Sequence, residues 1–484
     1  MSVLHDGEIL VKETYGSRNK KRFYIKPPFQ RSVIVFEEEY KTKVSNWFAK
    51  IFLPQGYPDS VSSDYISYQI WDTAQAFCST ITGTLATKEV LTGVGVGDIV
   101  TTPLAATFNW VTKEACGHLG RMVFSYTHGS YLDAYSKRWR LFADILNDIA
   151  MCMELALPLF KNHTTIILCT STILKAIVGV AGVATRAALT QHHAIRGNMA
   201  DVAAKDAAQE TAVNLIASIA ALLLMSFSGY SKLIFLLMVI LHIFFNYLAV
   251  KAVCLKTLNQ PRFLQLIDCY IRKNLISNPY DINQQEIIFT YLGSSRLERK
   301  ICGYEIKMGH SVNDIINNYT PTAVSIKDVK KIYRKRKYIL IPVVCNNSMY
   351  VLIKEGASTE DLLHAYFHAV LLSIVISSIN NKKLRIFDDN SNQSSFARTC
   401  ATLLSVEWTG EKAELHGPGG KVTYYEPSCN LITFVDSIVS SFWNQFRTSL
   451  LSTGWNLTKH LLVVDEWRIA KIPSEYEIPV AFDM

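Results

Sequence analysis

Three charged side chains recur at four-residue intervals in an otherwise rather apolar stretch of the chain. Arg140, Asp144 and Asp148 lie in LDAYSKRWRLFADILNDIAMCMEL (132–155), and their spacing places them on one stripe of a helix. Arg140 can neutralise Asp144 one turn away, which leaves Asp148 beside a like charge in apolar surroundings. Such a carboxylate is typical of sites that handle protons or cations. The alternative is an interfacial helix whose acids face water.

A second group of charges follows a run of small residues. The segment GVAGVATRAALTQHHAIRGNMADVAAKD (179–206) begins with glycine, alanine and valine, a composition that lets helices pack closely. Its second half is polar, and its adjacent His192 and His193 point about 100° apart on a helix, so we expect them to be poor joint ligands for one metal. We predict that the charged stripe is part of a larger buried polar network. This segment and the apolar run before it contribute its other four members, which are Lys175, Arg186, Asp201 and Lys205.

Two further motifs have the spacing of known binding sites. Glu360, His364 and His368 are four residues apart on one predicted helix face, which is a spacing that metal ligands use. No other strong ligand motif accompanies them, so we expect no metal, and the sequence names no cofactor. The glycine-rich HGPGGK (416–421) lacks the strand-to-helix setting of a phosphate loop and predicts a turn.

The elements that must position these charges are long apolar segments. Hydrophobic residues make up 49% of the 484-residue chain and charged residues 19%, with a mean hydropathy of +0.15. The stretches 212–228 and 233–250 are nearly free of charge and predict a membrane-spanning helical hairpin, although a buried core pair is the alternative. Four weaker segments bring the predicted total to six: 66–87, 90–112, 141–160 and 163–184.

Charge and cysteine usage suggest where such a protein resides. Basic residues flank the apolar region on both sides, so we expect both termini on the cytosolic side of an intracellular membrane. We expect no signal peptide, because the basic N-terminal cluster is not followed by an apolar region. The ten cysteines show no paired spacing, which indicates a reducing compartment. The basic run VKKIYRKRK (329–337) could contact anionic lipid, but a solvated segment leading into a strand is the favoured interpretation.

The sequence thus predicts three regions and a mainly α fold. Residues 1–50 form a basic arm, and 51–260 form a polytopic helical membrane-type bundle of about four to six apolar helices, with a possible internal repeat between 90–117 and 179–206. Residues 261–484 form a soluble α+β domain. In that domain YILIPVV and MYVLIKE predict strands around the turn CNNS, and Ser358 with Asp361 predicts a capped helix start.

Four long blocks resemble one known family. They are FLPQGYPDSVSSDYISYQIWDTAQAF (52–77), GVGVGDIVTTPLAATFNW (93–110), KRWRLFADILNDIAMCMEL (137–155) and KAIVGVAGVATRAALTQHHAIRGNMADVAAKDAAQET (175–211). In this order they resemble the root UVB-sensitive family, and YVLIKEGASTEDLLHAYFHA extends the likeness towards the C-terminus. The resemblance implies a membrane protein. Plant members of the family are associated with ultraviolet-B responses, auxin transport and vitamin B6 homeostasis. It implies no catalytic residue.

Three classes of function follow from the pattern and the resemblance. The first is a non-enzymatic multi-pass membrane protein that handles a small polar or anionic solute through the predicted polar network. The second is a membrane-anchored adaptor whose C-terminal domain binds a protein partner or a family homologue. An enzyme ranks third, with Lys175 carrying a pyridoxal cofactor. Membrane lipid is an expected partner in each case, and nucleic acid is not.

Overall fold

The chain divides into two compact units, which are described separately below. The computed structural model describes residues 8–15, 20–27, 33–39, 46–93, 103–226, 231–288, 294–318, 326–384, 409–417 and 420–470. The first unit covers Met1–Cys254 and the second covers Leu255–Met484. The described residues are mainly helical, and the strands of the second unit make it an α+β fold.

The basic N-terminal arm contains a small antiparallel sheet that its composition did not predict. Its strands follow one another in space: β1 (Glu8–Tyr15), β2 (Lys20–Lys26) and β3 (Ile34–Glu39). Lys20, Lys21 and Arg22 of the basic cluster lie in the central strand, where Arg22 faces Glu13 of β1. Opposite charges at facing positions of neighbouring strands stabilise the pairing, so Arg22 has a structural role within this sheet.

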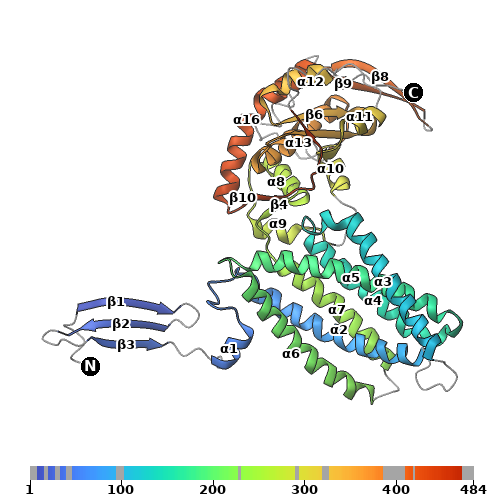
Figure 1. Cartoon of the computed structure of the whole chain (residues 1–484). Helices are drawn as coiled ribbons and strands as arrows, with labels where there is room; N and C mark the ends of the chain where they lie inside the picture. Colours follow the sequence, from blue (N-terminus) through green and yellow to red (C-terminus); the bar gives the residue numbers. More distant parts are fainter. Residues whose placement is uncertain are drawn as a thin grey trace. The chain divides into compact units, whose positions relative to one another are not determined.

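Each of the six predicted apolar segments overlaps a long helix of the first unit. These helices follow the short α1 (Asn46–Phe52), and they are α2 (Tyr65–Gly93), α3 (Pro103–Leu132), α4 (Ser136–Leu155), α5 (Thr164–His193), α6 (Met199–Met225) and α7 (Ser231–Ala252). The predicted segment 90–112 is instead divided between the end of α2 and the start of α3, and 94–102 lies outside the described residues. Helix α2 packs lengthwise on α7, and α5 packs on both α3 and α4 (Figure 1).

Close helix packing occurs at different glycines from those that the sequence suggested. A methyl group placed on Gly179 or Gly182 would meet no atom within 4 Å, so these positions are not close contacts in this unit. The tight contacts lie on α3 instead, where a Cβ on Gly117 would come to 3.0 Å from Thr172 and one on Gly120 to 3.2 Å from Ile173. The close contact between α3 and α5 is therefore made by glycines of α3 and larger residues of α5.

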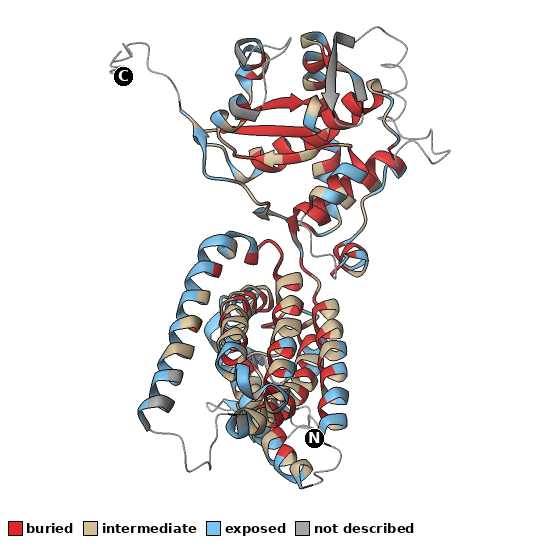
Figure 2. Ribbon diagram, turned by 90° about the vertical axis from the view of Figure 1, so that its right-hand side faces the viewer, coloured by how far each residue is buried: buried red, intermediate tan, exposed pale blue. Residues whose placement is uncertain are grey.

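The outward faces of the helices carry many apolar side chains. Helices α5, α6 and α7 are long and apolar enough to cross a membrane, and only 11–33% of their most apolar windows is buried within the structure. The exposed apolar side chains of α6 and α7 include Leu215, Ile219, Leu222, Leu233, Leu237 and Ile240. Figure 2 shows buried inner faces and exposed outer faces on the helices of this unit.

The second unit is built on a small mixed sheet. Strands β11 (Arg468–Ile469), β7 (Ser348–Lys354) and β5 (Glu305–Met308) run parallel, while β6 (Tyr338–Val343) pairs antiparallel with β7. The other described elements of this unit are β4 (Thr257–Asn259), α8 (Gln260–Lys273), α9 (Pro279–Gln285), α10 (Ser295–Ile301), α11 (Val312–Asn318), α12 (Ile326–Ile332), α13 (Thr359–Ile379), β8 (Thr409–Gly417), β9 (Gly420–Pro427), α16 (Cys429–Ser452) and β10 (Asn456–Leu461).

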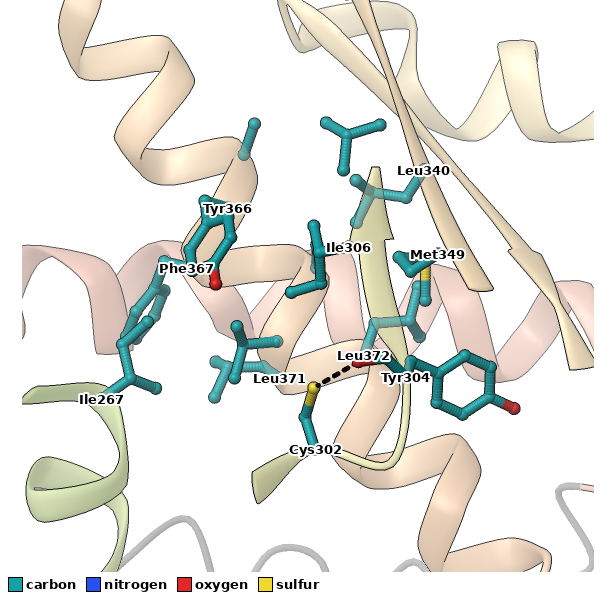
Figure 3. Packing of buried hydrophobic residues seen from close by; sticks show 14 of the residues in the cluster. Ile267, Cys302, Tyr304, Ile306, Leu340, Met349, Tyr366, Phe367, Leu371 and Leu372 are labelled. Carbon is teal, nitrogen blue, oxygen red and sulfur yellow. Dashed lines mark hydrogen bonds between the residues drawn. The ribbon is translucent and has the colours of Figure 1, made fainter. Parts of the chain in front are cut away.

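Helix α13 is the centre of this unit and bears out the local sequence prediction. Its N-terminus has the expected capping box, in which the Ser358 hydroxyl accepts from the Asp361 amide and the Asp361 carboxylate accepts from the Ser358 amide. The helix packs on β5, β6 and β7, and Figure 3 shows its Phe367, Leu371 and Leu372 in the core. Strands β8 and β9 pair up to Gly417 and Gly420, and the middle of the HGPGGK segment, 418–419, lies outside the described residues.

Candidate functional site

The first unit contains a chain of buried polar side chains between its helices. Gln69, Asp72 and Gln75 are spaced three residues apart on α2, so they share a face that turns towards the other helices. Composition alone did not single them out, because an isolated glutamine or aspartate between apolar residues is common at a helix surface. The spacing of three residues is the signal that could have identified them.

His242 on α7 is fully buried and lies between Asp148 of α4 and Gln75 of α2. Its Nδ1 is 2.8 Å from Asp148 Oδ2, and its Nε2 is 2.9 Å from Gln75 Oε1. Asp148 is the carboxylate that the charged stripe left without a neutralising partner, and the structure provides that partner from α7. The sequence analysis did not consider His242, because it lies inside the most apolar predicted span.

The hydrogen bonds around Gln75 determine which atoms face the His242 ring. The Gln75 amide nitrogen donates to Asp72 Oδ1 at 3.2 Å, which turns the amide oxygen towards His242. Both ring nitrogens of His242 then face acceptors, since a carboxylate and an amide oxygen only accept. A doubly protonated imidazolium beside an ionised Asp148 satisfies this arrangement, because each ring nitrogen then donates to an oxygen.

Arg140 continues this chain of contacts on α4. Its guanidinium donates to Asp72 Oδ1 at 3.1 Å and lies 3.5 Å from Asp144 Oδ2, so the predicted neutralisation of Asp144 is present and is shared with a second acid. Asp144 also accepts from the Asn246 amide of α7. We call the five groups that connect α4, α7 and α2 the buried relay, and they are Asp148, His242, Gln75, Asp72 and Arg140.

Arg186 makes a separate group with α6. Its guanidinium lies 2.6 Å from Asp206 and 2.5 Å from Glu210, and Gln69 of α2 donates to Asp206 at 3.0 Å. Arg186 and Asp206 belong to the stretch 179–206, whose polar half thus folds back on itself across the turn between α5 and α6. Residue Gln69 brings this group onto the same face of α2 as the relay, one turn away.

The other predicted network residues lie apart from the relay. Lys175 pairs with Glu154 at 2.6 Å, and the Ser171 hydroxyl donates to the same carboxylate. Asp201 and Lys205 bind the backbone of α1 and of the residues just after it, since Asp201 accepts from the Gln55 amide and the Lys205 ammonium donates to the Lys50 carbonyl. The structure therefore joins Arg140, Asp144 and Asp148, and it places the four remaining predicted residues at four other contacts.

A compact cluster of ligand-type side chains lies where α2 begins and α5 ends. Asp64 Oδ2 is 2.8 Å from His192 Nε2 and accepts from the Cys254 amide at 2.6 Å. Although burial opposes ionisation, the hydrogen bond from His192 and its charge hold the pKa of Asp64 well below its ordinary value. His193 is also buried, and its Nδ1 is 2.7 Å from the Ser62 hydroxyl.

This cluster differs from the geometry that the sequence suggested for the two histidines. One ligand atom from each of Asp64, His192 and His193 lies within 4.8 Å of the others. Successive helical positions diverge by about 100°, but this does not keep the ligand atoms of His192 and His193 apart, because α5 ends at His193. The residue spacing within one helix could not reveal Asp64, which is more than a hundred positions away.

In the second unit, the helix face with metal-ligand spacing has other partners. Glu360 pairs with Arg447, and the His364 ring stacks on Trp443 with centroids 5.2 Å apart. Burial lowers the pKa of His364 to about 4, and His368 Nδ1 lies 3.1 Å from the Tyr338 hydroxyl. Glu360 and His364 line a polar recess of about 360 Å³ with other residues, among them Arg336, Ser440 and Asn444.

Comparison with known proteins places both units in one family pattern. A family profile described as a vitamin B6 photo-protection and homoeostasis domain matches residues 38–274. A second profile, the root UVB sensitive protein C-terminal domain, matches 275–409 and 397–471. The buried relay and the Asp64 cluster both lie within the first match. No solved structure matches the chain.

Curated relatives agree with these profiles. "RUS family member 1" of Dictyostelium discoideum is 47% identical over 251 residues, and the match spans 50% of this chain and only 48% of that relative. "Protein root UVB sensitive 3" of Arabidopsis thaliana is 30% identical over 380 residues, covering 76% of this chain and 84% of the relative. "Protein root UVB sensitive 2, chloroplastic" of the same plant is 26% identical over 354 residues, covering 72% and 78%.

Proposed function

Because this chain belongs to the root UVB-sensitive family, we propose that its helical unit crosses a membrane and moves a small polar solute together with a proton. The observation that carries the proposal is the buried relay, in which the His242 ring lies between Asp148 and Gln75 with each ring nitrogen within hydrogen-bond distance of an oxygen. Ionisable groups inside an apolar helical bundle are costly, and they are characteristic of proton and ion pathways.

The distribution of apolar surface supports a membrane location. In a soluble protein the large exposed side chains of α6 and α7 would form an apolar surface that water disfavours. In a bilayer the same side chains contact lipid, and the charged groups of the relay stay inside the bundle.

The charges of the polar network favour some solutes over others. Asp72, Asp144, Asp148, Asp206 and Glu210 supply five carboxylates, while Arg140, Arg186 and a protonated His242 supply three positive charges. This excess of acidic groups disfavours a free anion inside the bundle. The vitamin B6 description of the family profile suggests the solute to test first, and the charge balance favours unphosphorylated vitamers over their phosphate esters.

Reconstituted vesicles provide the direct test. The purified chain in liposomes should take up labelled pyridoxine when an inward proton gradient is imposed, and Asp148→Asn should lower this flux by tenfold or more because the amide cannot balance the His242 charge. Asp133→Asn is the matched control, because Asp133 is an exposed aspartate just before the same helix. Equal flux for Asp148→Asn and the wild-type chain would contradict the proposal.

The two other classes of function have less support from the geometry. A lysine that forms a Schiff base must be a neutral amine in a dry site, but the Lys175 ammonium is partly exposed and paired with Glu154.

The polar recess of the second unit is the observation that favours an adaptor, since charged and aromatic side chains gather there. In that case the chain should co-purify with a second family member, and Glu360→Lys should abolish this while Asp148→Asn should not.

A further inference from the structure

We propose that Asp64, His192 and His193 form a binding site for a divalent transition-metal ion. The three residues offer two imidazole nitrogens and one carboxylate oxygen, and these atoms lie within 4.8 Å of one another. The inference is independent of the proposed transport function, because none of these residues belongs to the buried relay.

An unsatisfied carboxylate oxygen points to the ligand. The Asp64 side chain is nine-tenths buried, and its Oδ1 has no hydrogen-bond partner among the described residues. This oxygen lies 3.7 Å from His193 Nδ1, which is too long for a hydrogen bond. A buried oxygen of this kind is costly to leave unpaired, and a cation placed between it and the two imidazoles would satisfy it.

The distances fit a bound ion after a small adjustment. With metal–ligand bonds near 2.0 Å, tetrahedral ligand atoms are about 3.3 Å apart. The 2.8 Å between Asp64 Oδ2 and His192 Nε2 and the 3.7 Å between Asp64 Oδ1 and His193 Nδ1 lie on either side of this spacing. Since the two contacts use different carboxylate oxygens, a bound ion would require either a small rotation of the carboxylate or both of its oxygens. The Ser62 hydroxyl, 2.7 Å from His193 Nδ1, would either move aside or take the fourth position.

The backbone around the cluster is already held in place. Val61 forms an isolated antiparallel bridge with Ala194, and the Ser62 amide donates to the His193 carbonyl at 3.0 Å. The Cys254 amide holds Asp64 from the end of α7. Because these contacts fix the start of α2 against the ends of α5 and α7, the ligands do not have to be ordered by the ion.

The ligand set decides the class of ion. Calcium and magnesium prefer sites made of oxygen atoms alone, whereas imidazole nitrogens suit zinc, iron and other transition metals. Two histidines with one carboxylate are used both by zinc sites and by non-haem iron sites. We therefore use Zn²⁺ as the probe and let elemental analysis report any metal that the purified chain already holds.

The test uses the full chain, purified in detergent through an affinity tag without histidine. After chelation and reloading with Zn²⁺, inductively coupled plasma mass spectrometry should find one ion per chain. His192→Gln and His193→Gln should each weaken Zn²⁺ binding by at least about tenfold, since even the loss of an outer-shell contact costs that much. His128→Gln is the matched control, because this histidine of the same unit stacks on Phe124 outside the cluster.

X-ray absorption on the Zn²⁺-loaded wild-type chain keeps the test decisive if a variant fails to fold. Two imidazole shells and one oxygen near 2.0 Å are the expected result. The proposal is overturned if the folded wild-type chain retains no ion, or if the spectrum shows all-oxygen coordination. It is also overturned if a folded His192→Gln variant binds Zn²⁺ as tightly as the wild-type chain.

Discussion

At the scale of single residues, Gln75 has the largest effect on the chemistry of the buried relay. An amide can present either its oxygen or its nitrogen to a neighbour, and the contact with Asp72 selects the oxygen for His242. A proton leaving His242 would remove one of these two hydrogen bonds and leave Asp148 without its counter-charge. The protonation of His242 is therefore coupled to the packing of α2 against α7.

Glu298 provides a test of buried charge in the second unit. Burial raises the pKa of Glu298 to about 7, although its carboxylate accepts from the Ile306 amide and the Tyr366 hydroxyl. The folded-state pKa lies above the unfolded one, so folding favours the protonated acid and stability falls as pH rises between these two values. The loss is about 3 kcal/mol in order of magnitude and is complete above pH 7.

Glu298→Gln should remove this dependence, because the amide has a similar shape and no charge. The Tyr366 hydroxyl can accept from the new amide group, so the local hydrogen bonds are preserved. Differential scanning fluorimetry of the purified chain at pH 5 and pH 8 checks the expectation. The variant should gain stability relative to the wild-type chain on going from pH 5 to pH 8, and a constant difference between the two proteins would refute it.

At the scale of helices, the contact between α3 and α5 depends on a glycine. The backbone of Ile173 lies 3.5 Å from the position of a Cβ on Gly120, so a larger side chain cannot be accommodated by a rotamer change alone. Gly120→Leu should therefore lower the free energy of unfolding by about 1–3 kcal/mol. The measurement is the temperature at which the chain in detergent loses its monodisperse elution peak.

Gly182→Leu is the matched control on the other helix. A Cβ there meets no atom of the unit within 4 Å, and replacing a helical glycine stabilises a helix by up to about 1 kcal/mol. We expect an unchanged or slightly higher melting temperature. If Gly182→Leu were as damaging as Gly120→Leu, the small residues of α5 would have to pack on something other than this chain.

The elements differ in how far the sequence could predict them. Apolar length located α2, α4, α5, α6 and α7 and only the start of α3, and the capping box and continuous apolar runs located β6, β7 and α13, because these signals are local. Contacts between distant segments were not accessible in this way. His242 and Asp148 are 94 residues apart, and Asp64 is 128 residues from His192, so neither pair leaves a spacing that one helix could reveal.

The same limit applies to the predicted polar network. Seven charged residues were grouped because they occur in or near apolar segments, but such residues find partners by three-dimensional packing. Lys175 lies against Glu154 and Lys205 against the Lys50 carbonyl, whereas Arg140 joins Asp72 of α2. Charge pattern thus identified the helix stripe of Arg140, Asp144 and Asp148 and could not assign the partners on other helices.

At the scale of the whole molecule, apolar composition has opposite consequences in the two units. Helix α13 has a mean hydropathy of 1.9 over its most apolar window, which is within the range of the candidate spans of the first unit. However, 78% of that window is buried inside its own unit, compared with 11–33% for α5, α6 and α7. The apolar face of α13 is already covered by protein, so it needs no lipid.

This contrast predicts different solubilities for the two units. Residues 255–484 should fold without detergent and stay in the aqueous phase of a Triton X-114 separation, because the unit has its own core of buried side chains. Residues 46–254 should enter the detergent phase, since the outward faces of α6 and α7 remain apolar when the unit is folded. Circular dichroism confirms that each fragment is helical before it is partitioned.

A folded 255–484 fragment in the detergent phase would show that α13 or another face of this unit contacts lipid. A folded 46–254 fragment in the aqueous phase would remove the basis for a membrane-spanning bundle.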